Sequence, residues 1–306
     1  MSSRAHPSWI PDLALLLAAF GGVHCGGCST SSSRSSSGAP SAHSTKAPPV
    51  ALSPVPPAPY RIMWHQVFEA DLDAAAAFYA DVTGWTTQRS GPDRVMCLGS
   101  AGPVANVQRI TDEMKAAGVR PYWSAFVQVA DVDTTTELAR SHGWRVVFGP
   151  ADVVGVRVAS FVDGEGALLS VAHWTPPLPP RDRRMAGEFL WDEVVTRDAA
   201  GAATILGDLF AWKPVSEMPS GAAGKYVVFA RDGIPVAGLF ADPTIATSGW
   251  MSYVHVTDLD AALGRAKRAG GTVMLGPQVA GDERLAQVRD PQGAIFGLRE
   301  GAAVTR

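Results

Sequence analysis

Two stretches of this chain have the same design, DLDAAAAFYADVTGW at residues 71–85 and DAAGAATILGDLFAW at residues 198–212. Each begins with Asp, carries a second Asp ten residues later and ends with Trp, and the two starts are 127 residues apart. A constant offset over many positions does not arise from composition, so the chain is a tandem duplication. Further pairs at this offset are Trp64 and Trp191, Trp123 and Trp250, Asp131 and Asp258, Gly149 and Gly276, and Asp163 and Asp290.

The offset slips once inside the repeat. GPVAN at 102–106 matches IPVAG at 234–238 with an offset of 132, so the second copy gains five residues around MPSGAAG at 218–224. It loses five again before Trp250. Length changes of this kind belong in loops, and the Ser, Gly and Ala of the insert are typical of a hairpin tip.

A fainter repeat lies within each copy, because ADLD at 70–73 recurs as ADVD at 130–133. Both follow a strand-like stretch, and the Asp is suited to cap the helix that follows. Alternating or wholly apolar runs bounded by Gly come next and predict three strands. The repeating unit is therefore strand, helix and three strands, present four times, which makes an α+β protein. In the first helix Ala75, Phe78, Tyr79 and Val82 form one apolar face, so Phe78, Tyr79 and Trp85 are predicted core residues.

These patterns divide the chain into a first domain at 60–174, a Pro-rich linker at 175–185, a second domain at 186–300 and a tail at 301–306. The 306 residues are 46% hydrophobic and 18% charged, with a net charge of −3. A charge so close to zero favours neither nucleic acid nor an anionic membrane surface as a partner. Phosphate-binding loops, Ser-His-Asp spacing and zinc-type Cys pairs do not occur. Cys97 lies in an apolar run and is expected to be buried.

The first 59 residues have a different character. Residues 1–28 contain an apolar run, LALLLAAFGGV at 13–23, which fits a signal-peptide core and is too short for a transmembrane helix. Residues 29–59 are a Ser- and Pro-rich tether. The arrangement resembles a bacterial lipoprotein signal, with Cys28 favoured over Cys25 as the lipidated residue. It predicts a protein anchored to the bacterial cell envelope through an N-terminal lipid. The alternative is a disordered extension on a cytoplasmic protein.

The repeated unit, together with FYADVTGW at 78–85, VDGEGALLSV at 162–171 and DPQGAIFGL at 290–298, resembles the vicinal oxygen chelate superfamily. This superfamily includes glyoxalase I, extradiol dioxygenases and bleomycin-resistance proteins, and the doubled chain is most similar to its two-domain hydroxylase-like branch. The resemblance implies four βαβββ modules forming two domains, each with a mixed sheet folded into a cup. It also implies, for the enzymes, one divalent metal held in the cup by His, Gln or Glu from the first and last strands of the modules.

The corresponding positions in this chain carry other residue types. Trp64 and Trp191 stand at the first ligand position of the two copies, Ser124 and Met251 at the second, and Ser170 and Gly297 at the position of the last. The remaining strand, PVANVQRI at 103–110 or PVAGLFA at 235–241, contains no His or carboxylate. Indole, glycine and thioether are poor ligands for hard divalent metals, so no cofactor is expected.

Residues of the same strand parity are predicted to line the two cups, whereas His65 points to the opposite face as a helix-packing or surface histidine. Glu193 and His255 share a parity and are the candidates for a displaced metal site, although two ligands are fewer than a tight site uses. The predicted cup residues are Trp64, Gln66, Phe68, Ser124, Phe126, Gln128 and Ser170 in the first copy, and Trp191, Glu193, Met251, Tyr253 and His255 in the second.

Three functions are compatible with this pattern. An apolar concavity with a few polar groups favours binding of a small apolar or aromatic molecule without metal. The second function is a structural or interaction module whose cups are filled by their own side chains. The third is a metal-dependent lyase or dioxygenase with a displaced site. The partners expected are a small-molecule ligand and the other domain, paired either within the chain or across a homodimer.

Overall fold

The computed structural model describes residues 60–301 apart from 154, 179, 180, 182, 184, 221–223, 244, 246, 247, 281 and 282. The predicted leader, the tether, Cys28 and most of the tail lie outside the described residues. Within the described part, no helix is long and apolar enough to cross a membrane.

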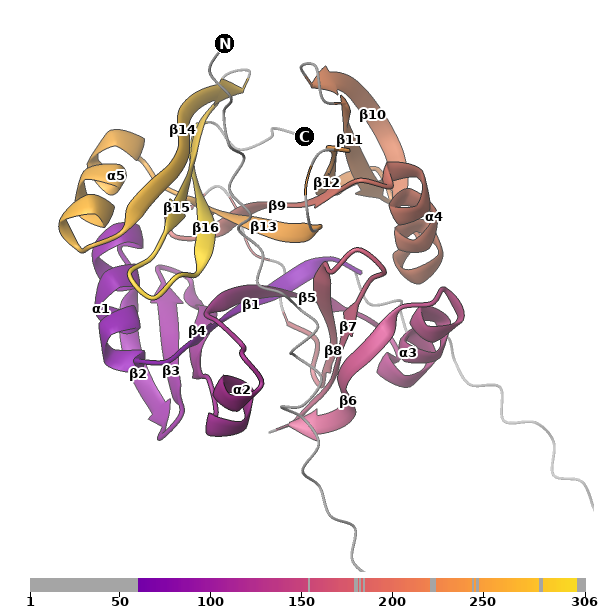
Figure 1. Ribbon diagram of the computed structural model, residues 1–306, viewed down its shortest axis with the longest axis horizontal. Coiled ribbons are helices and arrows are strands. Elements are labelled where there is room, and N and C mark those ends of the chain that lie inside the picture. The colour runs from indigo at the N-terminus through magenta and orange to yellow at the C-terminus, as the bar shows by residue number, and fades with distance from the viewer. Residues whose placement is uncertain are drawn as a thin grey trace, which may run out of the picture.

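Each half of the chain forms one eight-stranded sheet (Figure 1). The elements of the first half are β1 (Ile62–Glu69), α1 (Leu72–Thr83), β2 (Thr86–Gly91), β3 (Arg94–Gly99), β4 (Gly102–Arg109), α2 (Asp112–Ala116), β5 (Tyr122–Gln128), α3 (Val132–Ser141), β6 (Arg145–Val153), β7 (Val156–Val162) and β8 (Leu168–Trp174). Those of the second half are β9 (Phe189–Thr196), α4 (Ala199–Phe210), β10 (Lys213–Ser220), β11 (Gly224–Arg231), β12 (Ile234–Ala241), β13 (Gly249–His255), α5 (Leu259–Arg268), β14 (Thr272–Ala280), β15 (Glu283–Arg289) and β16 (Ile295–Glu300).

The strand order confirms the four βαβββ modules. The first sheet runs β2-β3-β4-β1-β5-β8-β7-β6, and the second repeats this order as β10-β11-β12-β9-β13-β16-β15-β14. In each sheet the first strands of two modules pair antiparallel at the centre, and each is parallel to the last strand of its own module. The sheets bend around these central strands, so the two cups open in opposite directions, downward and upward in Figure 1.

An Asp caps the N-terminus of each of the four module helices, as the repeat predicts. The carboxylates of Asp71, Asp131, Asp198 and Asp258 accept hydrogen bonds from backbone N–H groups in the first turn. Such a side chain satisfies donors that the helix itself leaves unpaired, because the first N–H groups have no carbonyl partner.

The hydrophobic core lies between the two sheets and is shared by the two domains. One cluster joins α1 and its sheet to α5 and its sheet, and the other joins the strands behind α3 to α4 and its sheet. In Figure 1, α1 lies below α5 on the left and α3 below α4 on the right. The predicted core residues Phe78, Tyr79 and Trp85 are 3% exposed or less, and Cys97 is fully buried. Each module therefore buries its helix side against a module of the other domain.

Equivalent residues of the two copies make reciprocal contacts across this interface. The indole N–H of Trp85 donates to the carbonyl of Gly187 over 2.6 Å, and the indole of Trp212 donates to the carbonyl of Tyr60 over 2.7 Å. The members of each donor and acceptor pair are related by the 127-residue offset. Trp85 and Trp212 thus each bind the backbone just before the first strand of the other domain.

A second reciprocal pair fixes the junction between first strand and helix. Gln292, in the last turn of the second domain, accepts hydrogen bonds from the N–H groups of Ala70 and Asp71. Its counterpart Glu165 accepts from the N–H of Arg197, with 2.9 Å between the heavy atoms. The domains are consequently related by a local two-fold arrangement.

The two length differences between the copies lie where the change of offset from 127 to 132 and back predicts them. The inserted residues 218–224 include the end of β10, at Ser220, and the start of β11, at Gly224. The five residues missing before Trp250 correspond to α2, a short helix of the first domain that the sequence analysis did not predict. The described residues between β12 and β13 contain no such helix. Only the first cup therefore has side chains that pack against α2, namely Phe68 and Tyr122 among the described residues.

Candidate functional site in the two cups

Strand alternation assigns the faces of β1 as predicted. Trp64, Gln66 and Phe68 point into the first cup and are half-buried, whereas the residues between them are buried against the second domain. His65 is one of those residues. It is 3% exposed and packs face to face on Phe189 with ring centroids 3.5 Å apart. The interpretation of His65 as a helix-packing or surface residue was therefore wrong, because the opposite face of β1 is covered by another domain.

His65 also makes a polar contact across the interface. Its Nε2 lies 2.7 Å from Oδ1 of Asp192, the residue at the equivalent position of the second copy. Burial disfavours the charge of Asp192, but His65 and then Arg183 outweigh it and lower the pKa of that carboxyl. His65 therefore belongs to the domain interface rather than to a cup.

One wall of the first cup carries a chain of neutral hydrogen bonds. The indole N–H of Trp64 donates to Oδ1 of Asn106 over 2.8 Å, and the amide of Asn106 donates to Oε1 of Gln66 over 3.2 Å. Asn106 lies on β4 opposite Gln66 and is 3% exposed. The bonds fix the edge of the indole and leave its ring half-buried at the cup surface.

The other wall is built from three serines. The hydroxyl of Ser170 lies 3.0 Å from that of Ser124 and 2.8 Å from that of Ser160. Both Ser124 and Ser170 are nearly fully buried, so these hydroxyl groups satisfy one another beneath the surface. Phe126, next to Ser124 on the same face of β5, remains half-buried.

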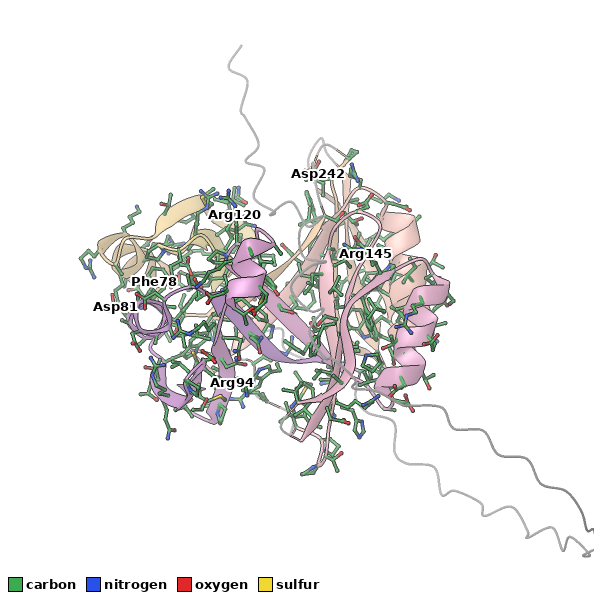
Figure 2. The ribbon with its side chains drawn as sticks, turned by 60° about the horizontal axis from the view of Figure 1, so that its bottom comes forward. Phe78, Asp81, Arg94, Arg120, Arg145 and Asp242 are labelled. Carbon is green, nitrogen blue, oxygen red and sulfur yellow. The ribbon has the colours of Figure 1, made fainter. Side chains whose placement is uncertain are left out.

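Two of the predicted residues are already engaged with protein. Phe68 stacks on Tyr122 with centroids 4.8 Å apart, and both pack against the cluster around α2. Gln128 is 1% exposed and accepts a hydrogen bond from the N–H of Leu178 in the linker. Figure 2 looks toward the first cup and shows α2 in front of the sheet, with Arg120 just beyond the helix. The residues of the first cup that stay half-buried outside these contacts are Trp64, Gln66 and Phe126.

The second cup is filled at its base. Trp191, Met251 and Tyr253 form a separate apolar cluster and are 7% exposed or less. Two glycines make room for the aromatic rings around them. A Cβ at Gly297 would lie 2.1 Å from the ring of Tyr253, and one at Gly238 would lie 2.1 Å from the hydroxyl of Tyr226.

Glu193 is held in this cup by two phenols. Its Oε1 accepts from the hydroxyl of Tyr253 and its Oε2 from that of Tyr226, each over 2.8 Å. The indole N–H of Trp191 donates to the hydroxyl of Tyr226 over 2.6 Å. Burial raises the pKa of Glu193, and the two hydroxyl groups and the charge of Arg299 oppose that rise. Both carboxyl oxygens are thus occupied by protein donors.

Glu193 and His255 face the same cup, as their parity predicts, but the register separates them. Glu193 lies opposite Met251, and His255 follows Val254, which lies opposite Phe189. Four residues along a strand correspond to about 13 Å, which is too far for joint ligation. Among the described residues, no group of three or more His, Cys, Asp or Glu side chains gathers as around a metal ion. The structure does not bring the displaced site together.

The sequence analysis missed the residues that organise both cups. Asn106 lies on β4 and Tyr226 on β11, and each bonds the indole of the cup's Trp. The 132-residue offset that matches GPVAN to IPVAG pairs Asn106 with Gly238 and Arg94 with Tyr226. This offset could have indicated the difference between the cups. Gly238 stands where the first copy has Asn106, so the indole of Trp191 needs an acceptor from another residue.

Comparison with known proteins agrees with this architecture. Residues 61–171 match the model of the Glyoxalase/Bleomycin resistance protein/Dioxygenase superfamily. The first half of the chain thus matches this superfamily in sequence, and the second half repeats its strand order. "Putative glyoxylase CFP32" of Mycobacterium bovis is 27% identical over 248 residues, which cover 77% of this chain and 92% of that protein. "Anthracycline biosynthesis protein DnrV" of Streptomyces peucetius is 28% identical over 269 residues, covering 80% of this chain and 95% of that one.

Solved structures show the same fold. The Mn(II)-bound glyoxalase from Novosphingobium aromaticivorans superposes with a TM-score of 0.56 at 15% identity, covering 80% of this chain and 83% of that one. The E323L mutant of homoprotocatechuate 2,3-dioxygenase from Brevibacterium fuscum gives a TM-score of 0.58 at 14% identity, covering 82% and 74%. At this identity the likeness extends to the fold alone.

Proposed function

We propose that this protein binds a planar, largely apolar small molecule in its first cup, beside the half-buried Trp64, Gln66 and Phe126, without a metal ion. The observation that carries the proposal is the Trp64–Asn106–Gln66 chain, with donor–acceptor distances of 2.8 and 3.2 Å. It holds an indole by its edge and leaves part of its surface free. An aromatic ring held in this way is prepared to stack on a flat ligand, because little side-chain freedom is lost on binding.

The chemistry of the first cup supports a neutral recognition mode. Indole, amide, phenyl and hydroxyl groups line it, and the predicted residues of this cup include neither His nor a carboxylate. Indole and phenyl groups do not bind hard divalent metals, and the amides of Asn106 and Gln66 are already bonded to each other. Arg94 begins β3 and Arg145 begins β6, and Figure 2 shows them on opposite sides of the first domain. Arg94 donates to Gln108 over 3.1 Å, whereas Nη1 of Arg145 is buried without a hydrogen-bond partner among the described residues. An oxygen acceptor on the ligand, such as a phenol or quinone oxygen, suits this lining.

We propose a structural role for the second cup. Trp191, Met251 and Tyr253 fill its base, and Glu193 is bonded to two tyrosines, which leaves neither a free carboxyl oxygen nor an empty floor. The two alternatives from the sequence thus apply to different domains, with binding in the first and filling in the second.

The relatives support the class of ligand. Two similar proteins are named as anthracycline biosynthesis proteins and share 28% identity with this chain over most of its length. Anthracyclines contain a fused planar ring system with several oxygen substituents, which agrees with the flat, oxygen-bearing ligand proposed here.

Quenching of Trp fluorescence by an anthracycline and by a plain hydroxyanthraquinone tests the proposal. Trp64→Ala should weaken binding by about 1–3 kcal/mol, or roughly 5- to 150-fold in Kd. Trp191→Ala is the matched control in the second cup and should leave Kd within about twofold. Equal weakening by both variants, or by neither, would contradict the assignment to the first cup. Binding that requires added Mn²⁺ or Fe²⁺ would contradict the metal-free mode.

We also propose that Cys28 carries a lipid that anchors the protein to the bacterial cell envelope. The support is the sequence alone, in which a short apolar run precedes Cys28 and a tether follows it. Cys28→Ser should move the full-length protein from the membrane fraction to the soluble fraction. Unchanged fractionation of this variant would leave the cytoplasmic alternative.

A further inference from the structure

A cavity of about 150 Å³ lies between the two domains, outside both cups. It opens beside the start of β1, the end of the linker and the start of β9. Its volume is on the order of five water molecules at their share of liquid volume. Its lining consists of Arg61, Ile62, Met63, His65, Val104, Arg181, Arg183, Glu188 and Phe189.

One of the three arginines of this cavity is fully used by the protein. Arg181 forms a two-pronged ion pair with Glu188, with distances of 2.6 and 2.7 Å, and Glu188 is 2% exposed. Its Nη1 donates to the carbonyl of Pro103 over 2.8 Å. This pair ties the linker to both domains and neutralises the carboxylate within the lining.

The other two arginines keep unused donors. Nη2 of Arg183 donates to the carbonyl of Ile62 over 2.8 Å, whereas its Nη1 lies 3.8 Å from Asp192, beyond a hydrogen bond. Asp232, whose charge acts on Arg61, is itself paired with Arg231. Asp192 also bonds His65, and Asp232 acts on Arg61 from a distance. These two carboxylates and Glu188 are the acidic groups that face the arginines.

The electrostatics of Arg61 are dominated by burial and by a neighbouring cation. Burial, followed by the positive charge of Arg183, lowers its pKa, and the charge of Asp232 offsets only part of this effect. Two guanidinium groups facing one cavity repel each other, and an anion between them would remove that repulsion.

The remainder of the cavity is apolar. Ile62, Met63, Val104 and the ring of Phe189 form this part, and the ring of His65 is stacked on Phe189. An inorganic anion would gain nothing from such a surface, whereas a short hydrocarbon tail would be desolvated by it.

We propose that this cavity is a binding site for a small organic acid, whose carboxylate lies between Arg61 and Arg183 and whose short apolar tail contacts Ile62, Met63 and Phe189. A planar carboxylate matches the paired N–H donors of a guanidinium group. A bound acid would bridge β1 of the first domain, the linker and β9 of the second, and would stabilise the arrangement of the domains.

Calorimetric titration of the full chain with butyrate at low ionic strength tests the proposal. We expect saturable binding with one site per chain and a rise in melting temperature, because the ligand binds only the folded state. Butan-1-ol, with the same tail and no charge, should bind at least about tenfold more weakly, since a hydrogen bond to a charged group contributes that much. Inorganic phosphate, with charge and no tail, should also bind more weakly than butyrate.

The variants separate the cavity from other cationic sites. Arg61→Gln should weaken butyrate binding by at least about tenfold. Arg157→Gln, which removes a surface arginine paired with Asp133, should leave it unchanged. Met63→Trp, which fills the cavity and keeps its arginines, should abolish binding and serves if Arg61→Gln folds poorly. Trp64→Ala should have no effect, so failure of this site and failure of the proposed function are distinguishable.

The proposal would be overturned if no saturable binding is seen up to about 20 mM butyrate. It would also be overturned by equal affinities of the Arg61→Gln and Arg157→Gln variants, or by phosphate binding more tightly than butyrate.

Discussion

Single residues decide which cup is open. Ser170 in the first domain and Gly297 in the second occupy equivalent strand positions, yet one joins a group of serine hydroxyls and the other provides space for the ring of Tyr253. At a neighbouring position, Asn106 bonds the indole of Trp64, whereas Gly238 leaves room for Tyr226 to bond the indole of Trp191. Loss of side-chain volume at two glycines thus allows larger rings to fill the second cup.

The close fit at Gly297 predicts a large cost for one methyl group. A Cβ there would lie 2.1 Å from Tyr253, whose ring is 2% exposed and cannot move aside freely. Overpacking a core typically costs about 1–3 kcal/mol, so Gly297→Ala should lower the free energy of unfolding by that amount in a denaturant titration. Gly164→Ala, where a Cβ meets nothing within 4 Å, is the control and should change it by less than about 0.5 kcal/mol. Equal stability of the two variants would show that Tyr253 is not fixed.

At the residue scale, the sequence predicted the face of the sheet to which these side chains point but not their hydrogen-bond partners. Alternation placed Trp64 and Glu193 in the cups because a strand reverses the side of its side chains at every residue. It could not show that Gln128 bonds the linker or that Glu193 is bonded to Tyr226, because those contacts depend on the register between strands. His65 was misread for a related reason, since its partner Asp192 comes from the other domain.

At the scale of elements, the repeat predicted the four modules and the Asp that begins each module helix. These are local features, in which capping and periodicity act within a few residues of the chain. The short helix α2 was not predicted, because its five residues are too few to show a helical period. It nevertheless shapes the first cup, where Phe68 and Tyr122 pack against its cluster.

The capping interactions predict a measurable loss of stability at one helix. The carboxylate of Asp258 accepts from the N–H of Ala261 over 2.8 Å and caps α5, which packs on α1 of the other domain. Asp258→Ala should lower the free energy of unfolding by about 1 kcal/mol, and Asp258→Asn, which keeps an acceptor oxygen, should restore most of it. Thermal unfolding followed by circular dichroism measures both. If the Asn variant is as unstable as the Ala variant, the charge at the helix end matters more than the hydrogen bond.

At the scale of the whole molecule, the two domains share their cores and bury polar groups between them. The hydroxyl of Tyr79 donates to Oδ2 of Asp290 over 2.7 Å and accepts from the indole of Trp123 over 3.0 Å. Glu69, fully buried, faces Asp290 from the end of β1. Neither of its oxygens has a hydrogen-bond partner at ordinary distance among the described residues. The module period could not predict this group, because it joins residues of two domains.

The buried carboxyl pair makes the stability of the molecule depend on pH. Burial, followed by the interaction with Asp290, raises the pKa of Glu69 to about 11, so the folded protein keeps this proton across the neutral range. The unfolded chain releases it near the ordinary carboxyl pKa, and the folded state therefore holds more protons above about pH 5. Stability should consequently fall as the pH rises from about 5 to 9, by up to about 1.4 kcal/mol per pH unit for this proton.

Glu69→Gln removes the titrating proton but keeps a donor facing Asp290, and should therefore flatten the decline in unfolding midpoint between pH 5 and 9. The difference from the native protein should grow with pH, since the native carboxyl becomes harder to keep protonated as protons become scarce. Glu137→Gln, an exposed position on α3, is the control and should retain the full slope. Urea titrations at several pH values measure the slopes. A variant as pH-dependent as the native protein would mean that water reaches Glu69 and that the domain interface is looser than its packing indicates.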